Sequence, residues 1–310
     1  MKKLIVTADD FGAHDFIDAG IKEAVSAKCV NTISVITTFP DSKKRIEEYA
    51  EECRSKAPDV KFGIHLSFNA GSPVLKNEVS SLTKNGKFMG VNSYDYDKVD
   101  TFDVYKEAEA QIKLVIDAGV EPNHVSCHCG IMGLFPDFFK VYLLLAAKYE
   151  LPIRNPILIS REKIWGFRFS GMKREGLYRG IKIVESKGLD QALVNIASLT
   201  GDSITRKMKI FNGGNVTCPD YFIDTFYKNG SESRLKKILD KMPDNATSEM
   251  VVHLGQGHYD DSEKEQEKYN GINFKYFKGR IKELETITQK LNLHSAVEKD
   301  KNITMAHYPG

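Results

Sequence analysis

The sequence lacks the features that would place it in a specialised class of protein. It has only five cysteines in 310 residues, an odd number that suits a reducing compartment better than a framework of disulfides. It also lacks an excess of charge of one sign, because 44 Lys and Arg residues accompany 42 Asp and Glu residues. A net charge of +2 provides no extended basic surface, so we expect no nucleic-acid partner.

Long hydrophobic runs are absent as well. The longest apolar stretch near the middle of the chain, residues 141–147, is far shorter than the ~20 residues that a bilayer requires. The positively charged residues 1–3 resemble the start of a signal peptide, but Asp9 and Asp10 interrupt the following apolar run too soon. We therefore expect a cytoplasmic protein without a membrane partner.

Short β-branched runs alternate with amphipathic stretches along the chain. This alternation predicts an α/β fold, a parallel sheet covered by helices, in one domain that spans residues 1–310. The predicted strands are 3–7, 31–37, 60–66, 124–128, 151–159 and 250–253, with weaker signals at 208–211 and 303–306. The predicted helices are 15–27, 41–53, 102–118 and 136–149, with weaker signals at 182–199 and 233–241. A long loop insertion at about 72–100 is expected to be a lid or a dimer contact.

Polar residues follow or end several of the predicted strands. In chain order they are Asp9, Asp10, His65, His128, Arg154 and His253. In parallel α/β sheets and barrels, the carboxyl ends of the strands form the edge at which ligands bind and catalysis occurs. The sequence therefore predicts that these residues lie together in a functional site.

The two adjacent aspartates have a structural interpretation and a functional one. After a strand, Asp9 and Asp10 could simply cap the next helix or form a turn. In the functional interpretation their side chains point in different directions, so that one carboxylate binds a metal ion while its neighbour acts as a base. His65, isolated in an apolar strand, is by itself more typical of a satisfied core histidine than of a ligand.

The pair His124 and His128 is more informative. On a strand the two residues share a face but lie ~13 Å apart, at ~3.3 Å per residue, so both could bind one ion only if the strand ends and bends. We predict that His128, nearer the strand end, is the ligand and that His124 lies behind it. Cys127 and Cys129 lack the second pair of ligands that a structural zinc site needs. We therefore expect both cysteines to behave as small buried hydrophobic residues.

Together these residues resemble the YdjC-like carbohydrate deacetylase family, which includes chitooligosaccharide deacetylases. The matching motifs are 7–12 (TADDFG), 63–66 (GIHL), 71–74 (GSPV), the His124 and His128 pair, 135–136 (FP), 152–154 (PIR), 249–253 (EMVVH) and 280–285 (RIKELE). Their order and spacing carry the resemblance across nearly the whole chain. The chain departs from the family pattern at Ser126, where many relatives have an aspartate, and after His128, where they have a histidine-rich run.

The resemblance implies a TIM-like or distorted (β/α) barrel of the glycoside hydrolase/deacetylase type. It also implies one divalent metal ion, Mg²⁺ or Zn²⁺, that Asp10, His65 and His128 hold. Members of the family are often dimeric, so the resemblance further implies a homodimer.

The activity that the resemblance implies is metal-dependent hydrolysis of an N-acetyl group on a sugar, such as a chitooligosaccharide, with release of acetate. Asp9 matches the catalytic base, His253 the acid that protonates the departing amine, and Arg154 an arginine that orients or tunes the base. One alternative is a different metallohydrolase, such as a phosphoesterase, which favours a second metal ion. Another is a non-catalytic metal- and carbohydrate-binding relative, which needs neither Asp9 nor His253. A third is that the polar strand ends are merely structural.

Overall fold

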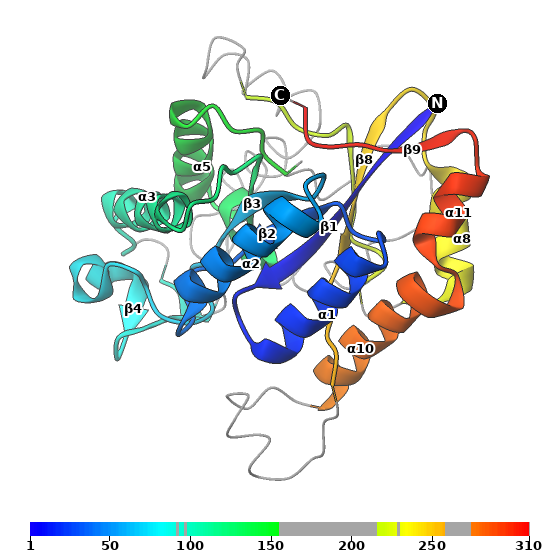
Figure 1. Ribbon diagram of the computed structural model, residues 1–310. Coiled ribbons are helices and arrows are strands. Elements are labelled where there is room, and N and C mark those ends of the chain that lie inside the picture. The colour runs from blue at the N-terminus through cyan, green and yellow to red at the C-terminus, as the bar shows by residue number, and fades with distance from the viewer. Residues whose placement is uncertain (91–92, 96–97, 155–215, 228–229, 258–273, 310) are drawn as a thin grey trace.

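A parallel sheet forms the centre of the molecule (Figure 1). The computed structural model describes residues 1–90, 93–95, 98–154, 216–227, 230–257 and 274–309. The strands of the sheet are β1 (Lys2–Phe11), β2 (Thr32–Val35), β3 (Lys61–Leu66), β6 (Val125–Cys127), β7 (Tyr221–Ile223), β8 (Thr247–Val252) and β9 (Ile303–Met305). Their order is β6-β3-β2-β1-β8-β7, and β9 pairs with the first residues of β1. All these pairs are parallel, which confirms the predicted α/β class.

Strand β1 is the central element of this sheet. It pairs with β2, β8 and β9, and its residues from Leu4 to Phe11 are all buried. A strand that is covered on both faces is typically a continuous run of aliphatic and β-branched residues, as in Leu4, Ile5 and Val6. The polar residues Asp9 and Asp10 at its carboxyl end are therefore deep inside the molecule.

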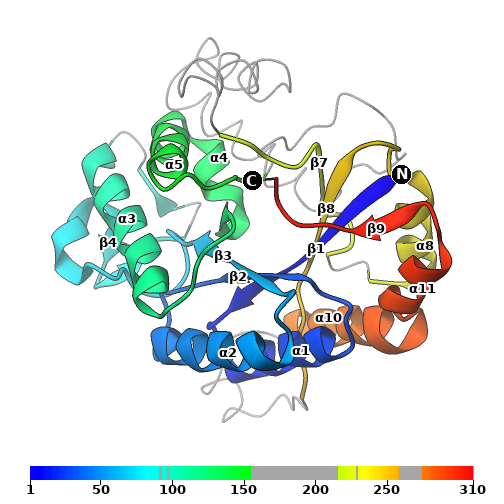
Figure 2. The ribbon, with the colours of Figure 1, turned by 45° about the horizontal axis from the view of Figure 1, so that its top comes forward.

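Helices surround the outer side of the sheet (Figure 2). They are α1 (Asp15–Ser26), α2 (Ser42–Lys56), α3 (Thr101–Asp117), α4 (Ile131–Leu134), α5 (Pro136–Lys148), α8 (Glu232–Lys241), α10 (Phe274–Glu285) and α11 (Leu293–Lys299), with a π-helical turn η5 (Thr286–Lys290). Each of the longer ones turns an apolar stripe inward, such as Phe16, Ile17 and Ile21 of α1. No helix of the described residues is long and apolar enough to cross a membrane.

The sheet is curled, so that residues at its two edges come together. Ile153 forms an isolated parallel bridge with Val125 of β6, and its backbone N–H donates to the Thr217 carbonyl, 2.9 Å away, ahead of β7. The guanidinium carbon of Arg154 lies 5.1 Å from the centre of the Phe222 ring on β7. The two edges of the curled sheet are therefore close enough for side chains from both to make contact.

The segment 72–100 is partly ordered into short elements that lie against α3. It contains the 3₁₀ segment η1 (Lys76–Leu82) and the two-stranded hairpin β4 (Thr83–Lys84) and β5 (Lys87–Phe88). The buried Glu107 carboxylate accepts the backbone N–H groups of Val74 and Leu75, and Asp103 accepts from Ser81. These contacts attach the first part of the insertion to α3.

Most of the predicted elements are present, with boundaries that differ by a few residues. Of the predicted strand 151–159, residues 151–154 form a single bridge at Ile153, and residues 155–159 lie outside the described residues. The predicted helix at 182–199 and strand at 208–211 lie outside the described residues. Strand β7 and helices α4, α10 and α11 were not predicted from the sequence; β7, α4 and α11 have only three, four and seven residues.

A buried carboxylate holds the turn that leads from β1 into α1. The Gly12 N–H donates to Asp18 Oδ1 at 2.7 Å, and Arg45 donates to Asp18 Oδ2 at 3.3 Å. Gly12 has φ +97°, and a Cβ there would lie 2.8 Å from the Ile36 carbonyl oxygen, so this turn requires glycine. Burial outweighs these contacts and raises the pKa of Asp18 to about 6.

This raised pKa predicts a specific pH dependence of stability. Between pH 4 and 6 the folded protein holds the Asp18 proton more tightly than the unfolded chain does, so the contribution of Asp18 to stability falls as pH rises. In urea unfolding, the free energy of unfolding of Asp18→Asn should therefore rise, relative to that of the wild type, by up to about 3 kcal/mol between pH 4 and pH 7. The matched control is Asp15→Asn on the same helix, because Asp15 is exposed and pairs with the same Arg45 at 2.8 Å. The prediction would be contradicted if the free energies of unfolding of the two variants depended on pH in the same way.

Candidate active site

Asp9 and Asp10 lie at a bulge in the central strand. Ala8 of β1 pairs with Ile33 and Phe11 pairs with Val35, so β1 has one more residue than β2 in this interval. Asp10 is in the left-handed region, with φ +75°. Such a bulge breaks the alternation of side chains that a regular strand imposes, so both carboxylates face His65 Nε2, at 3.8 Å for Asp9 and 3.5 Å for Asp10. The expectation that the two aspartates point in different directions is therefore wrong.

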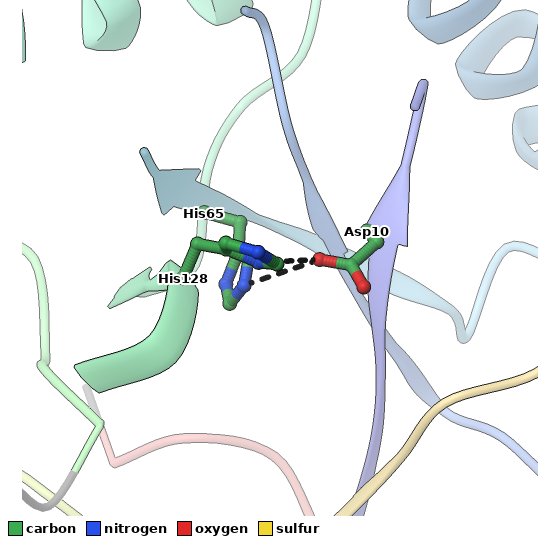
Figure 3. Close-up of side chains that lie close together, drawn as sticks. All are labelled: Asp10, His65 and His128. Carbon is green, nitrogen blue, oxygen red and sulfur yellow. Dashed lines mark hydrogen bonds and ion pairs between the residues drawn. The ribbon is translucent and has the colours of Figure 1, made fainter. Parts of the chain in front are cut away.

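Asp10, His65 and His128 come together from three elements (Figure 3). His65 is on β3, and His128 is the first residue of the 3₁₀ turn η3 (His128–Gly130) that follows β6. Asp10 Oδ1 is 2.9 Å from His128 Nδ1 and 3.5 Å from His65 Nε2. One ligand atom of each residue lies within 4.8 Å of the others; Asp10 and His65 are buried and His128 is half-buried.

The chemistry of these three groups fits a divalent metal ion. One carboxylate oxygen and two imidazole nitrogens suit Zn²⁺ and related transition metals. Ligand atoms that each lie about 2.1 Å from one tetrahedral ion are about 3.4 Å from one another, close to the separations of Asp10 from the two histidines. Three protein ligands also leave a coordination position for water or substrate, as catalytic sites require.

Arg154 connects Asp9 to a second buried carboxylate. Its Nη1 and Nη2 donate to the two oxygens of Asp9 at 2.8 Å, and its Nε and Nη2 donate to Glu249 Oε1 at 3.0 and 2.8 Å. Glu249 is on β8 and is fully buried. Glu249 is part of the 249–253 motif but had no predicted role, although a glutamate inside an apolar strand is a signal for a buried ion pair.

A second arginine holds Asp10. Arg280 of α10 is almost fully buried, and its Nη2 donates to Asp10 Oδ2, so that Asp10 Oδ1 remains directed at the two histidines. The guanidinium carbon also lies 4.5 Å from the centre of the Tyr276 ring. Arg280, in the 280–285 motif, likewise had no predicted role. The signal for it was an arginine on the face of α10 that carries the buried Phe277 and Leu284.

His253 lies just after β8, beside Asp9. Its Nε2 is 4.0 Å from Asp9 Oδ2, and its backbone N–H donates to Glu283 Oε2 at 2.9 Å. The Tyr227 ring packs against its imidazole, with 4.3 Å between the ring centres. The buried Nδ1 has no hydrogen-bond partner among the described residues.

The charges of these groups follow from burial and from their neighbours. Burial opposes ionisation of both aspartates, but Arg154 holds the pKa of Asp9 well below its ordinary value, and His128 and Arg280 do the same for Asp10. Burial lowers the pKa of His65 to about 4, against the attraction of Asp9 and Asp10, so this imidazole is neutral and able to donate a lone pair. Burial, reinforced by Arg280, also lowers the pKa of His253 to about 3.

His128 behaves differently from the other histidines. Burial alone would lower its pKa, but Cys129 and Asp10 outweigh that effect and raise the pKa well above the ordinary value. Without a metal ion, His128 therefore carries a positive charge beside Asp10 Oδ1, in addition to the Arg280 guanidinium at Oδ2. A divalent cation bound among Asp10, His65 and His128 would supply that positive charge in place of the imidazolium proton.

The other residues of the 124–129 segment divide between core and surface. His124 is fully buried and bonds to Ser34 rather than to the Asp10 group. Cys127 is buried, as expected. Cys129 is exposed, which corrects the expectation of a buried hydrophobic residue; it lies in the turn after β6 with φ +53° and so does not continue the alternation of the strand.

Comparisons with known proteins identify relatives over most of the chain. The model of the YdjC-like protein family matches residues 3–293. A carbohydrate deacetylase of Enterococcus faecalis is 30% identical over 236 residues, which cover 74% of this chain and 85% of the relative. One of Oceanobacillus iheyensis is 30% identical over 193 residues, 60% of this chain and 81% of the relative. A crystal structure from E. faecalis V583, described as a candidate cellobiose-phosphate cleavage protein, has a TM-score of 0.71 and 26% identity, covering 99% of this chain and 97% of that one.

Because Arg154 pairs with both Asp9 and Glu249, we expect its replacement to lower stability strongly. Arg154→Met leaves the Asp9 and Glu249 carboxylates buried without their common counter-charge, and should lower the free energy of unfolding by about 3–5 kcal/mol. Adding Glu249→Gln should recover part of this loss, because only one carboxylate then remains unpaired. The control is Arg54→Met, since Arg54 pairs with Glu51 at the surface and should cost less than about 1 kcal/mol. Urea unfolding curves measure all three, and similar losses for Arg154→Met and Arg54→Met would refute the prediction.

Proposed function

The chain belongs to the YdjC-like protein family, and on this premise we propose that it is a metal-dependent carbohydrate deacetylase. The reaction is hydrolysis of the amide bond of an N-acetylated sugar, such as a chitooligosaccharide, to acetate and an amino sugar. One observation carries the proposal: Asp10, His65 and His128 lie together directly beside a second carboxylate, Asp9, and a second imidazole, His253. A metal-ligand set with an adjacent base and acid is what amide hydrolysis requires.

Asp10, His65 and His128 would hold one divalent ion, Mg²⁺ or Zn²⁺, with His65 donating through Nε2. When bound, the ion lowers the pKa of a water molecule and stabilises negative charge on the carbonyl oxygen. Arg280 keeps Asp10 Oδ2 occupied, so Asp10 presents Oδ1 to the ion. The neutral state of His65 supports this role, because only a neutral imidazole has a lone pair to donate.

Asp9 and His253 are the proposed proton carriers. Asp9 is ionised and is oriented by both hydrogen bonds from Arg154, so it accepts a proton as water attacks the acetyl carbonyl. Because the pKa of His253 is about 3, this imidazole begins the cycle neutral. We propose that it receives the proton from Asp9, whose Oδ2 is 4.0 Å from His253 Nε2, and passes it to the departing nitrogen. The amide C–N bond then breaks, and the new bond between the water oxygen and the acetyl carbonyl carbon remains.

Three finer features of the proposal concern the rest of the molecule. The contact between the two edges of the curled sheet supports a distorted (β/α) barrel around this site. The sugar is expected to enter at the carboxyl ends of the strands, where the Asp10 group lies. A homodimer, and a role of segment 72–100 as a lid or dimer contact, stay predictions.

The alternative metallohydrolases are less well supported. Phosphoesterases of the two-metal type need a second ion about 3.5–4 Å from the first. Within the described ranges, Asp10, His65 and His128 form the one group of three possible ligands that lie together. Arg154 engages both oxygens of Asp9, which leaves this carboxylate poorly placed to bind a second cation.

The roles of the adjacent aspartates can be separated experimentally. Asp9→Asn should keep a stoichiometric divalent ion but lose at least 100-fold in acetate release, because general-base catalysis typically contributes about 10²–10⁴-fold. Asp10→Asn should lose the ion as well. Acetate release from N-acetylated mono- and oligosaccharides, with Zn²⁺, Mg²⁺, Mn²⁺ or Co²⁺ added to metal-stripped protein, provides the activity measurement.

Asp59→Asn is the control, because Asp59 is exposed and lies before the first residue of β3, at the opposite end of that strand from His65. It should bind metal and release acetate as the wild type does. Loss of metal from Asp9→Asn would mean that the two aspartates have exchanged roles. Stoichiometric metal with no acetate from any sugar would instead favour the non-catalytic alternative.

His253 should affect the departure of the amine rather than metal binding. His253→Gln keeps a polar side chain but removes the proton donor, so acetate release should fall about 10²-fold or more at unchanged metal stoichiometry. The loss should be smaller for a substrate with a more acidic amine as leaving group, because that group needs less protonation. An equal loss for both kinds of substrate would argue against the assignment of His253 as acid.

A further inference from the structure

A continuous chain of buried hydrogen bonds runs away from the Asp10 group behind His65. His65 Nδ1 is 2.8 Å from Ser126 Oγ, which is 3.1 Å from Ser34 Oγ. Ser34 Oγ is in turn 2.8 Å from His124 Nε2, and His124 Nδ1 is 2.7 Å from Asn123 Oδ1. Ser34, His124 and Ser126 are fully buried, so water does not compete for these contacts. We call His65, Ser126, Ser34 and His124 the buried hydrogen-bond chain.

The members of the buried hydrogen-bond chain constrain one another, because each hydroxyl has a single proton. Burial, followed by Arg154, lowers the pKa of His124 well below its ordinary value, so its imidazole is neutral, with one donor and one acceptor nitrogen. Asn123 presents an oxygen to Nδ1, so Nδ1 carries the proton and Nε2 accepts from Ser34. Ser34, having donated to His124, accepts from Ser126.

The hydrogen bonds of Ser126 bear on which nitrogen of His65 is protonated. Ser126 has two oxygens to which it can donate, Ser34 Oγ and the Ile64 carbonyl, each at 3.1 Å. When Ser126 donates to either oxygen, its proton points away from His65, and His65 Nδ1 is then the donor at 2.8 Å. The lone pair of His65 is then on Nε2, which faces Asp10 Oδ1 at 3.5 Å and Asp9 Oδ2 at 3.8 Å. Three electron-rich atoms converge there, an arrangement that a cation stabilises.

The far end of the buried hydrogen-bond chain is held by packing. Gly63 of β3 lies directly against the His124 ring, since a Cβ on it would be 2.0 Å from two ring atoms. The Tyr308 ring stacks on the same imidazole, with 4.1 Å between centres and 6° between planes. Tyr308 is itself buried, in the segment after β9. His124 therefore has a fixed orientation, and its nitrogens depend on Ser34 and Asn123 for hydrogen bonds.

We propose that the buried hydrogen-bond chain from His124 through Ser34 and Ser126 holds His65 in the Nδ1–H tautomer, so that Nε2 is permanently available as a metal ligand. Ser34 and His124 are thus positioning residues, which act on the site without contact with the ion or the sugar. This inference rests on the proposed metal site. Its first consequence, the tautomer of His65, belongs to the metal-free protein and is measurable whether or not the protein is a deacetylase.

The decisive experiment is nitrogen NMR of histidine in the full-length, metal-free protein labelled with ¹⁵N-histidine. Two-bond couplings between ring nitrogens and ring protons distinguish the Nδ1–H from the Nε2–H form, and His65→Gln assigns the signals. We expect His65 in the Nδ1–H form in the wild type. Ser34→Ala should shift part of the His65 population toward the Nε2–H form, because Ser126 then keeps only the Ile64 carbonyl as another acceptor and can turn its proton toward His65. His65 in the Nε2–H form in the wild type, or unchanged by Ser34→Ala, would overturn the proposal.

Thr32→Val is the matched control. Thr32 precedes Ser34 by two residues on β2, is equally buried, and its hydroxyl has no hydrogen-bond partner among the described residues. Removing that hydroxyl should leave the His65 tautomer unchanged. Ser34→Thr, which keeps the hydroxyl, should restore the wild-type spectrum. If Ser34→Ala does not fold, His124→Phe tests the same point, since it keeps a ring against Tyr308 and removes both nitrogens.

Metal affinity provides the second readout. In calorimetric titrations of metal-stripped protein with Zn²⁺ or Co²⁺, Ser34→Ala should bind about 10- to 100-fold more weakly than the wild type, while Thr32→Val should bind equally well. Equal affinities of Ser34→Ala and wild type would overturn this consequence while leaving the metal site in place. If the wild type binds neither ion, the proposed function fails, and the NMR result still decides the tautomer.

Discussion

The bulge at Asp9 and Asp10 is the constraint on which the rest of the site depends. A regular strand would direct these neighbouring carboxylates to opposite faces of the sheet, and only one of them could reach the inner surface. The left-handed conformation of Asp10 turns both toward His65. The turn that follows is held by Gly12 and by the Asp18 carboxylate, so the conformation of the bulge is determined by residues that never touch the site.

Bringing two carboxylates together inside the molecule has an electrostatic consequence. Asp9 and Asp10 each bind their own arginine, and Arg154 is shared with Glu249, so two guanidinium groups face three carboxyl groups. His65 and His253 are neutral, and in this group of side chains the positive charge besides the two guanidinium groups is on His128 when no metal ion is bound. The arrangement therefore favours a cation beside Asp10, and the buried hydrogen-bond chain behind His65 points a lone pair to the same place.

The sequence was a good guide to the residues at the strand ends and a poor guide to the groups that support them. Asp10, His65 and His128 stood out because each follows or ends a predicted parallel strand, and the structure brings their ligand atoms together. Glu249 and Arg280 did not stand out, because their partners are 95 and 270 residues away along the chain. Likewise, nothing around Ser34 indicates that it bonds to His124, since that contact depends on how β2, β3 and β6 align.

The sequence by itself determined the α/β class, the positions of the main strands and helices, and the polar residues available at one edge of the sheet. Those features follow from hydrophobic periodicity and local turn preferences, which act over a few residues. Only the tertiary structure decided that both aspartates face the same way, that each is paired with an arginine, and that His65 is backed by Ser126, Ser34 and His124. These outcomes depend on strand register, on one extra residue in β1 and on burial, because the charge and protonation of a side chain are set by the neighbours that folding brings to it.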